Sequence, residues 1–341
     1  MQPNMKRLLK IGLLGAGHLG KIHLRCILQA NQAYELAGFY DPNPDTARET
    51  AQQFNIRAFP DADALIEAVD VVDIVTPTTT HYALAEKAIL AGKHVFIEKP
   101  LTRTLEEAEQ LIRLSKAQQV QVQVGHVERF NPALLALRGQ SLNPMFVEAH
   151  RLASFNPRGS DVSVVLDLMI HDLDIVLSMV HSPVKQVDAS GVSVVSETPD
   201  IANARIAFEN GCVANLTASR ISLKQMRKVR LFQRDAYISL DFLDKKAQIV
   251  RLFQPGDPAL PSDAPAISLD TSRGPKWLVM DNPEIEAGNA IQMELETFAQ
   301  SILEHTRPKV DIEDGYSALK LAYRIIQCIE ENNAAVQPVL P

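Results

Sequence analysis

Three side chains of this sequence have the types and spacing needed for proton transfer and charge stabilisation: Lys99, Asp167 and His171. Asp167 and His171 lie four residues apart in the apolar segment 164–177, whose spacing is helical, so both project from one helix face. The carboxylate can then orient the imidazole and stabilise its protonated form. The alternative is a polar pair on a solvated face, but the flanking residues are very apolar. A metal site would need more ligands than this pair provides.

Lys99 follows a strongly apolar strand and precedes Pro100, so its backbone is extended or in a turn. The direction in which its side chain leaves the backbone is therefore expected to be fixed. A lysine at a strand end is commonly just solvated, which is the alternative here. The functional interpretation is an ammonium group that stabilises a developing alkoxide and positions a substrate hydroxyl. Glu98 either pairs with this ammonium or caps the loop.

A glycine-rich loop follows the apolar run 8–14 and opens a helical pattern that extends to Leu28. The loop consists of Gly15, Ala16, Gly17, His18, Leu19 and Gly20. Its G-x-G-x-x-G spacing is the dinucleotide fingerprint, in which the first glycine allows a tight turn, the second lets backbone approach a pyrophosphate, and the third allows close helix packing. The helix N-terminus offers free N–H groups to the phosphates. Glycines also mark ordinary strand–helix turns, so the context must support this prediction.

That context is a second apolar segment, 34–40, which ends in Asp41, 21 residues beyond Gly20. A carboxylate at this place is expected to accept hydrogen bonds from the adenosine ribose and to repel a 2′-phosphate, so the cofactor is predicted to be NAD rather than NADP. The alternative for Asp41 is a turn residue before Pro42. Arg48 is nearby, but we expect it on the next helix.

The bulk properties limit the classes of function. A chain of 341 residues is too long for one ordinary core and indicates two domains. The formal net charge of −7 gives no general attraction to nucleic acid or acidic membranes. Three scattered cysteines favour a reducing compartment. With neither a membrane-spanning apolar stretch nor a signal-peptide pattern, we expect a cytoplasmic protein without a membrane partner.

Residues 1–125 are predicted to form a dinucleotide-binding Rossmann domain, because strands and helices alternate as in a doubly wound parallel sheet. Beyond the elements above, we expect strands at 56–59, 71–75, 93–97 and 120–124, and helices at 45–54, 62–69, 80–91 and 104–117. Ligands bind beyond the carboxyl ends of such strands. Three polar clusters follow strands in this way: 76–81, 98–100 and 125–132.

Residues 126–341 are predicted to form an α+β domain with a large open sheet. We expect helices at 132–142, 164–177, 289–304 and 314–330, strands at 146–153, 187–196, 201–208, 212–220, 228–233, 236–242 and 246–253, and a loop at 254–275. The later strands predict a mostly antiparallel sheet of five or six strands. An exposed sheet of this kind must be covered, which argues for a homodimer or homotetramer formed through it.

The chain resembles the Gfo/Idh/MocA oxidoreductase family over essentially its whole length. The matching residues are Gly15-Ala-Gly17-His-Leu-Gly20, Thr76-Pro77 with His81, Glu98-Lys99-Pro100, and Asp167-x-x-x-His171. The resemblance implies that Lys99, Asp167 and His171 are catalytic. It implies that the glycine loop, Asp41, Thr76, Pro77, His81, Glu98 and Lys99 contact a nicotinamide cofactor, and that the C-terminal sheet contacts a partner subunit. The segment 159–165 departs from the family's small glycine run, which argues against a simple free-sugar pocket.

Segments 124–132 and 156–171 resemble a narrower group of the family, bacterial enzymes that oxidise the 3-hydroxyl of UDP-N-acetylglucosamine on the way to a 2,3-diamino sugar used in lipid A. A nucleotide diphosphate needs cations, which Arg129, Arg151, Arg158 and Arg220 could supply. Asn131 and Asp172 are also predicted to contact the substrate. The alternatives are another substrate (a free sugar, an inositol, an imine or a tetrapyrrole) and an NAD-binding sensor without catalysis.

Overall fold

The structure is a computed structural model that describes residues 8–156, 162–260 and 265–335. The chain forms two compact units. The first contains Met1–Phe130 and Gly288–Leu319, and the second contains Asn131–Ala287 and Lys320–Pro341. The domain boundary predicted at residue 125 stays a prediction. The first compact unit ends its first segment at residue 130 and also includes 288–319. This second segment contributes a helix to the core of the first unit.

The first unit is built on a five-stranded sheet in the order β2-β1-β3-β4-β5, with every neighbouring pair parallel. Its strands are β1 (Leu9–Leu14), β2 (Tyr34–Tyr40), β3 (Val71–Ile74), β4 (His94–Glu98) and β5 (Val122–Gly125). The predicted doubly wound parallel sheet is therefore confirmed. At the predicted strand 56–59 the structure has a single bridge, between Ala58 and Phe39.

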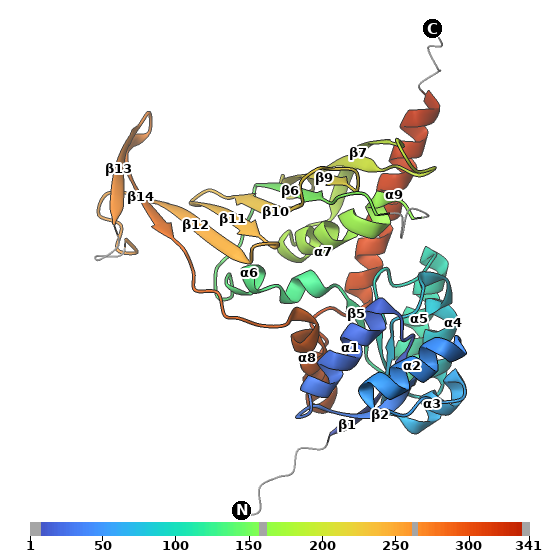
Figure 1. Ribbon diagram of the computed structural model, residues 1–341. Coiled ribbons are helices and arrows are strands. Elements are labelled where there is room, and N and C mark those ends of the chain that lie inside the picture. Colours follow the sequence, from blue (N-terminus) through green and yellow to red (C-terminus); the bar gives the residue numbers. More distant parts are fainter. Residues whose placement is uncertain (1–7, 157–161, 261–264, 336–341) are drawn as a thin grey trace, which may run out of the picture. The chain divides into compact units, whose positions relative to one another are not determined.

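Helices cover both faces of this sheet (Figure 1). They are α1 (His18–Gln29), α2 (Pro44–Phe54), α3 (Ala62–Ala68), α4 (Thr78–Leu90), α5 (Leu105–Gln118) and α8 (Ala290–Glu304). Alternate residues of β1 face opposite layers. Leu13 packs in one core with α1 and α8, while Gly12 faces α3 so closely that an added Cβ would lie 2.6 Å from Leu65 Cδ2. Arg48 lies on α2, as expected, and pairs with Asp45.

The second unit contains a nine-stranded sheet in the order β13-β14-β12-β11-β10-β6-β9-β8-β7, in which only the β6–β9 pair is parallel. The strands are β6 (Phe146–Leu152), β7 (Val184–Val192), β8 (Ile201–Phe208), β9 (Val213–Ser219), β10 (Met226–Phe232), β11 (Ala236–Asp241), β12 (Lys246–Phe253), β13 (Ala266–Thr271) and β14 (Gly274–Asp281). The predicted mostly antiparallel sheet is confirmed, with more strands than expected. Burial alternates along β8, so one face of the sheet is covered and the other is exposed.

Two other sequence predictions in this unit are also wrong. Part of the predicted loop 254–275 belongs to the β13–β14 hairpin, whose turn is closed at Gly274 with a φ of +93°. The helix predicted at 132–142 is only the short α6 (Pro132–Leu135), and the chain turns further on at Gly139, which has a φ of +81°. The second error arises where glycine allows a left-handed backbone that redirects the chain.

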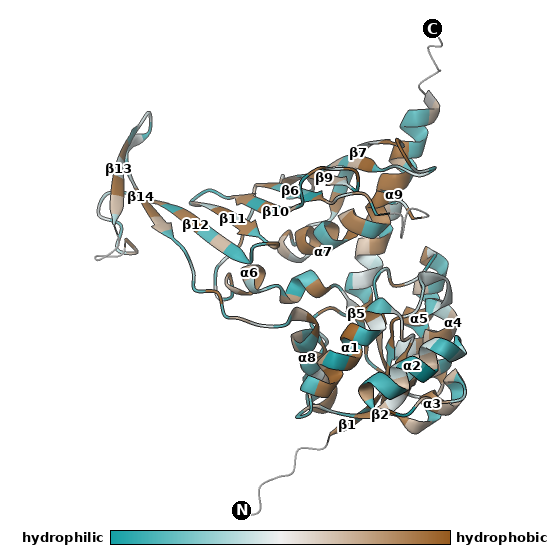
Figure 2. Ribbon diagram, viewed as in Figure 1, coloured by the Kyte–Doolittle hydropathy of each residue, from teal (hydrophilic) through white to brown (hydrophobic). Residues whose placement is uncertain are grey.

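The covered face of the second sheet packs against η2 (Val165–Met169), α7 (Ile170–Met179) and the later part of α9 (Ile312–Ala335). The segment η2 is a π-helical turn, a local widening that is frequent at functional sites. Hydropathy follows burial: α7 is mainly hydrophobic and α2 mainly hydrophilic (Figure 2). None of the described helices combines the length and the apolar character needed to cross a membrane.

Candidate active site

The carboxyl ends of the five parallel strands lie level with one another. Across the sheet the register pairs Leu14 with Tyr40 and Ile74, then Ile74 with Ile97, and Ile97 with Val124. The residues that follow these positions therefore share one edge of the sheet. They include the glycine loop, Asp41, Thr76, Glu98 with Lys99, and Gly125, so the three polar clusters predicted to face a ligand begin at this edge.

The glycine loop leaves no room for side chains at two of its three glycines. Gly15 has a φ of +93°, and a Cβ there would lie 2.7 Å from the carbonyl oxygen of Val75. A Cβ on Gly20 would lie 1.9 Å from the carbonyl oxygen of Gly15. Gly17, the residue that caps α1, faces open space, because an added Cβ meets nothing within 4 Å. This is the arrangement that a bound pyrophosphate requires: a tight turn, a closely packed helix, and exposed backbone between them.

Asp41 is held against this loop. Its Oδ2 accepts a hydrogen bond from Ala16 N at 2.8 Å, and its Oδ1 accepts one from Asn43 N at 2.9 Å. Asn43 in turn caps α2. The carboxylate expected to bind ribose thus lies beside the loop expected to bind phosphate, so these residues fit a dinucleotide. Gly15, Gly17, His18, Leu19 and Gly20 would hold its phosphates.

His81 joins two of the predicted cofactor loops. Its Nε2 lies 2.9 Å from the carbonyl oxygen of Thr76, and its Nδ1 lies 3.0 Å from that of Pro100. The ring is buried, and burial lowers the pKa of His81 although both carbonyls favour the charged form. Thr76 also accepts a hydrogen bond from Thr80 Oγ1, and Pro77 is the residue that caps α4. The structure therefore places His81 under the loops, where it fixes their backbone.

Beneath Lys99 lies a buried group that sequence reasoning missed. His23 of α1 lies between two carboxylates, with Nδ1 2.9 Å from Asp73 Oδ2 and Nε2 3.1 Å from Glu98 Oε1. Glu98 Oε2 accepts a hydrogen bond from Lys99 N at 3.2 Å. Asp73 interrupts the apolar strand β3, and a carboxylate inside a buried strand is a signal that the sequence did offer.

The charges of this group stabilise one another. Burial alone would lower the pKa of His23, but the charges and hydrogen bonds of Asp73 and Glu98 raise it well above its usual value, so the two carboxylates favour the imidazolium form. Burial would raise the pKa of Glu98, but the hydrogen bond and charge of His23, with the charge of Lys99, lower it. Burial raises the pKa of Asp73 against the opposing effect of His23.

The second unit carries the other two predicted catalytic residues. Asp167 lies in the π-helical turn η2, and His171 lies in the first turn of α7. The sequence predicted a continuous α-helix through both, so the π turn is a difference in local geometry. The pair still belongs to one helical run, because Asp167 N donates to Ser163 O at 3.0 Å and α7 continues directly from η2.

Two arginines predicted to bind substrate are engaged by carboxylates of their own unit. Arg151 of β6 donates to Asp172 through Nε to Oδ2 at 3.1 Å and through Nη2 to Oδ1 at 2.8 Å, and both side chains are 4% exposed. Arg220 lies 3.9 Å from Asp200 and donates to the carbonyl oxygen of Val162. Their predicted role in substrate binding stays a prediction, with Arg151 and Asp172 now seen as partners.

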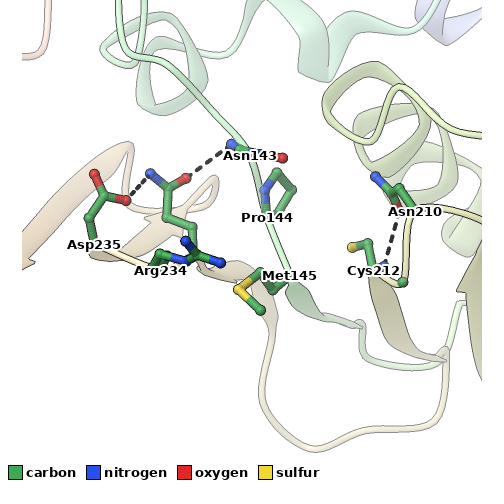
Figure 3. A pocket seen from close by; sticks show the side chains of 9 residues that line it. Asn143, Pro144, Met145, Asn210, Cys212, Arg234 and Asp235 are labelled. Atoms are coloured by element: carbon green, nitrogen blue, oxygen red, sulfur yellow. Dashed lines mark hydrogen bonds between the residues drawn. The ribbon is translucent and has the colours of Figure 1, made fainter. Parts of the chain in front are cut away.

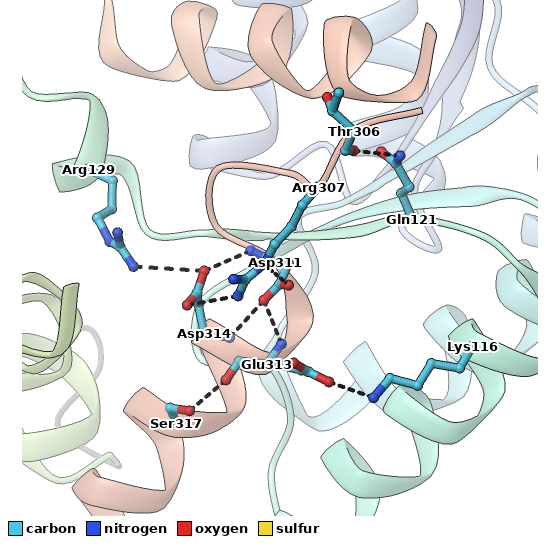
Figure 4. A network of polar contacts seen from close by, with 9 residues as sticks. All are labelled: Lys116, Gln121, Arg129, Thr306, Arg307, Asp311, Glu313, Asp314 and Ser317. Carbon is cyan, nitrogen blue, oxygen red and sulfur yellow. Dashed lines mark hydrogen bonds and ion pairs between the residues drawn. The ribbon is translucent and has the colours of Figure 1, made fainter. Parts of the chain in front are cut away.

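Of the other predicted substrate residues, Arg129 and Asn131 take part in local structure. Arg129 of η1 (Val127–Phe130) lies 3.9 Å from Asp314 in a network that includes Arg307 and Asp311 (Figure 4). Asn131 caps α6 and donates through Nδ2 to Phe242 O at 3.0 Å. Arg158 lies outside the described residues, as does part of the segment 159–165.

A separate hollow of about 510 Å³ lies at the turns of the second sheet (Figure 3). It is lined by 143–145, 210–212 and 233–235, none of which carries a predicted site residue. Burial raises the pKa of Cys212 in its wall to about 11, so that thiol is not reactive at neutral pH.

Comparison with known proteins agrees with this geometry. Residues 9–126 match a sequence family described as "Oxidoreductase family, NAD-binding Rossmann fold", and residues 134–237 match the GFO/IDH/MocA C-terminal domain. The chain belongs to the GFO/IDH/MocA oxidoreductase family. The predicted enzyme class, an NAD-dependent dehydrogenase, and the predicted cofactor, NAD, are thereby confirmed at the level of this family.

Individual enzymes match nearly the whole chain. UDP-N-acetylglucosamine 3-dehydrogenase from Acidithiobacillus ferrooxidans is 37% identical, with 94% of this chain and 97% of that enzyme covered. A solved structure of that enzyme superimposes with a TM-score of 0.84, covering 95% of this chain and 99% of the other. Myo-inositol 2-dehydrogenase from Thermotoga maritima is 26% identical, with 96% and 98% covered. The enzymes named here act on small molecules, as expected for this chain.

Proposed function

We propose that the protein oxidises the 3-hydroxyl of UDP-N-acetylglucosamine to a keto group with NAD, for the biosynthesis of an amino sugar of the lipid A type. The observation that carries the proposal is the 37% identity, over nearly the full length of both chains, to an enzyme named for this reaction. The segments 124–132 and 156–171 support it. The second candidate is a family dehydrogenase acting on an inositol, which the full-length match to a myo-inositol 2-dehydrogenase favours.

In the proposed reaction, the hydroxyl proton passes to His171 while Asp167 orients the ring and stabilises the imidazolium. Lys99 donates a hydrogen bond to the substrate oxygen and stabilises the alkoxide as the carbonyl forms. NAD, when bound, supplies the acceptor for the hydride that leaves the carbon. Asp41, Thr76, Pro77, His81, Glu98 and the glycine loop are the residues proposed to hold or frame the cofactor. Arg129, Asn131, Arg151, Arg158, Asp172 and Arg220 are proposed to serve the nucleotide sugar.

The substrate is tested by incubating the purified protein with NAD and either UDP-N-acetylglucosamine, UDP-glucose, free N-acetylglucosamine or myo-inositol. NADH absorbance gives the rate, and mass spectrometry should show the nucleotide sugar lighter by two hydrogens. We expect turnover with UDP-N-acetylglucosamine and at least about 100-fold less with the free sugar, since the diphosphate contacts are lost. Turnover with myo-inositol alone would replace the proposal by its second candidate.

The catalytic roles are tested by Lys99→Ala and His171→Ala. Removing a general base or an oxyanion donor should lower kcat by about 10²- to 10⁴-fold. NADH binding, followed by its fluorescence, should be retained in the His171 variant. Arg48→Ala, an exposed change on α2, is the matched control and should leave both quantities unchanged. If His171→Ala keeps the rate of the unaltered enzyme, the proposed base is wrong.

We propose further that the protein is a homodimer or homotetramer in the cytoplasm, assembled through the exposed face of the nine-stranded sheet. That face carries an aromatic row in which the rings of Phe146 and Phe232 are 5.9 Å apart and those of Phe232 and Tyr237 5.0 Å apart. A partly exposed row of aromatic rings of this kind is typical of a surface that contacts another protein chain. Phe232→Asp should give a monomer in sedimentation velocity, whereas Leu90→Asp on α4 should not change the mass.

A further inference from the structure

The two residues that flank Lys99 are each held by a buried histidine. On one side, His23 Nε2 lies 3.1 Å from the carboxylate of Glu98. On the other side, His81 Nδ1 lies 3.0 Å from the carbonyl oxygen of Pro100. Both rings are at most 1% exposed. The backbone that carries the Lys99 side chain is therefore held by buried contacts at the residue before it, Glu98, and at the residue after it, Pro100.

The contact made by His23 links three elements of the first unit. His23 belongs to α1, which begins at the glycine loop, Asp73 belongs to β3, and Glu98 ends β4. The edge of the imidazole also meets the ring of Phe96, with centroids 5.7 Å apart. Gly125 also lies against the carboxylate of Glu98, because an added Cβ would lie 2.8 Å from Glu98 Oε1. The carboxylate of Glu98 thus has one position, set by His23, Gly125 and Lys99 N.

Stability alone does not explain this arrangement. A buried ion network contributes little net stability compared with apolar residues of the same volume, since each charge must be removed from water. Removing one member, by contrast, leaves a buried charge without its counter-charge. Such a network is best suited to holding its members in one geometry. Here the member at its outer end, Glu98, bonds directly to the amide of Lys99.

We propose that His23 is a positioning residue for Lys99 and acts through Glu98. Its imidazolium keeps the Glu98 carboxylate ionised and oriented, and the carboxylate fixes the Lys99 amide and thereby the origin of the Lys99 side chain. This inference rests on the proposed function only for the role of Lys99 in turnover. The geometric part can be tested without any substrate.

The substrate-free test is hydrogen exchange at the Lys99 amide in the full-length protein, read from overlapping peptides by mass spectrometry. His23→Gln removes the cation and should speed this exchange at least about tenfold, because the hydrogen bond from Lys99 N to Glu98 Oε2 loosens. His94→Gln is the matched control: it changes a histidine at the opposite end of the same strand, whose Nδ1 accepts from Gln121 N at 3.0 Å. In that variant, exchange at Lys99 should not change.

A second variant keeps the test valid if His23→Gln fails to fold. Asp73→Asn leaves the imidazole of His23 in place and lowers its pKa, since Asp73 is one of the two carboxylates that favour the protonated ring. It should speed exchange at Lys99 by a smaller factor than His23→Gln. Unchanged exchange at Lys99 in a folded variant of either kind overturns the proposal.

Measurements of turnover test whether His23 acts on Lys99 through Glu98. A misplaced Lys99 should lower kcat of His23→Gln by about 10- to 100-fold, with the NADH dissociation constant changed less than about threefold. In a Glu98→Gln background the same His23 change should cost less than about threefold, because its route to Lys99 is already cut. Equal losses in both backgrounds would show that His23 acts elsewhere. If the unaltered enzyme has no activity on the nucleotide sugar, the proposed function fails while the exchange result still stands.

Discussion

The buried pair of Arg151 and Asp172 gives the sharpest stability prediction. Its two hydrogen bonds, 2.8 and 3.1 Å long, join β6 to α7 directly beside His171, and each side chain is only 4% exposed. Asp172→Asn keeps the shape and removes the negative charge that the buried guanidinium of Arg151 faces. Breaking a buried pair in this way costs about 3–5 kcal/mol, or more than about 100-fold in the unfolding equilibrium.

The same strand provides a matched control. Glu148 of β6 pairs with Arg230 of β10 at 2.8 Å, but these side chains are 31% and 39% exposed. Glu148→Gln should therefore cost no more than about 1 kcal/mol. The assay is guanidinium unfolding followed by the fluorescence of Trp277, the single tryptophan of the chain, which lies in β14 of the same unit. The double variant Arg151→Met with Asp172→Leu should lose less stability than Asp172→Asn.

Equal, small losses from Asp172→Asn and Glu148→Gln would refute this reasoning, because burial would then have no effect on the cost. A second outcome separates structure from substrate binding. If Arg151 serves only the ion pair, the double variant that folds should retain the KM for the nucleotide sugar. If KM rises at least about tenfold in that variant, at least one of Arg151 and Asp172 also contacts the substrate, as the sequence predicted for both.

Two further predictions concern other carboxylates. Asp41→Ala should weaken NADH binding by about 10- to 100-fold, measured by fluorescence titration, because it removes the hydrogen bonds to the ribose together with the one from Ala16 N of the glycine loop. NADPH binding should fall less, because its 2′-phosphate no longer faces a carboxylate; equal losses for both would contradict this. Asp200 accepts three backbone N–H bonds from 194–196, which hold its pKa below the usual value although burial would raise it. The contribution of Asp200 to the free energy of unfolding is therefore complete above the unfolded-state pKa of about 3.9. It is lost as the pH falls through the lower pKa of the folded state. Asp200→Asn should cost about 1–3 kcal/mol at pH 7 and less in acid, as measured by thermal unfolding.

The parallel sheet and the loops at the carboxyl ends of its strands could be predicted, because the sequence patterns that specify them are local. The glycine loop, the acidic residue at the end of β2 and the apolar strands each follow from a few adjacent residues. The π turn at η2 could not be predicted in this way, since its sequence has ordinary helical spacing and the widening depends on packing in the second unit. The β13–β14 hairpin was missed because 254–265 is rich in proline and aspartate, which hid the alternation that follows.

Contacts between charged residues far apart in the sequence were the main features that could not be predicted. Arg151 and Arg220 looked like cations available to a phosphate, because a sequence shows a charge without its partner. The structure places Asp172 beside Arg151 and Asp200 near Arg220. His23 was overlooked for the same reason: its two carboxylates lie 50 and 75 residues away, and only the sheet brings them together.

The return of α8 to the first unit has a consequence for synthesis on the ribosome. Phe298 packs against Phe96 with ring centroids 6.3 Å apart, and the carbonyl oxygen of Leu295 accepts a hydrogen bond from the hydroxyl of the buried Tyr34. When the first 130 residues have left the exit tunnel, these partners have not yet been translated. The apolar face that receives α8 therefore stays uncovered until residues 290–304 have been translated and have left the tunnel, and chaperones can bind it during that time.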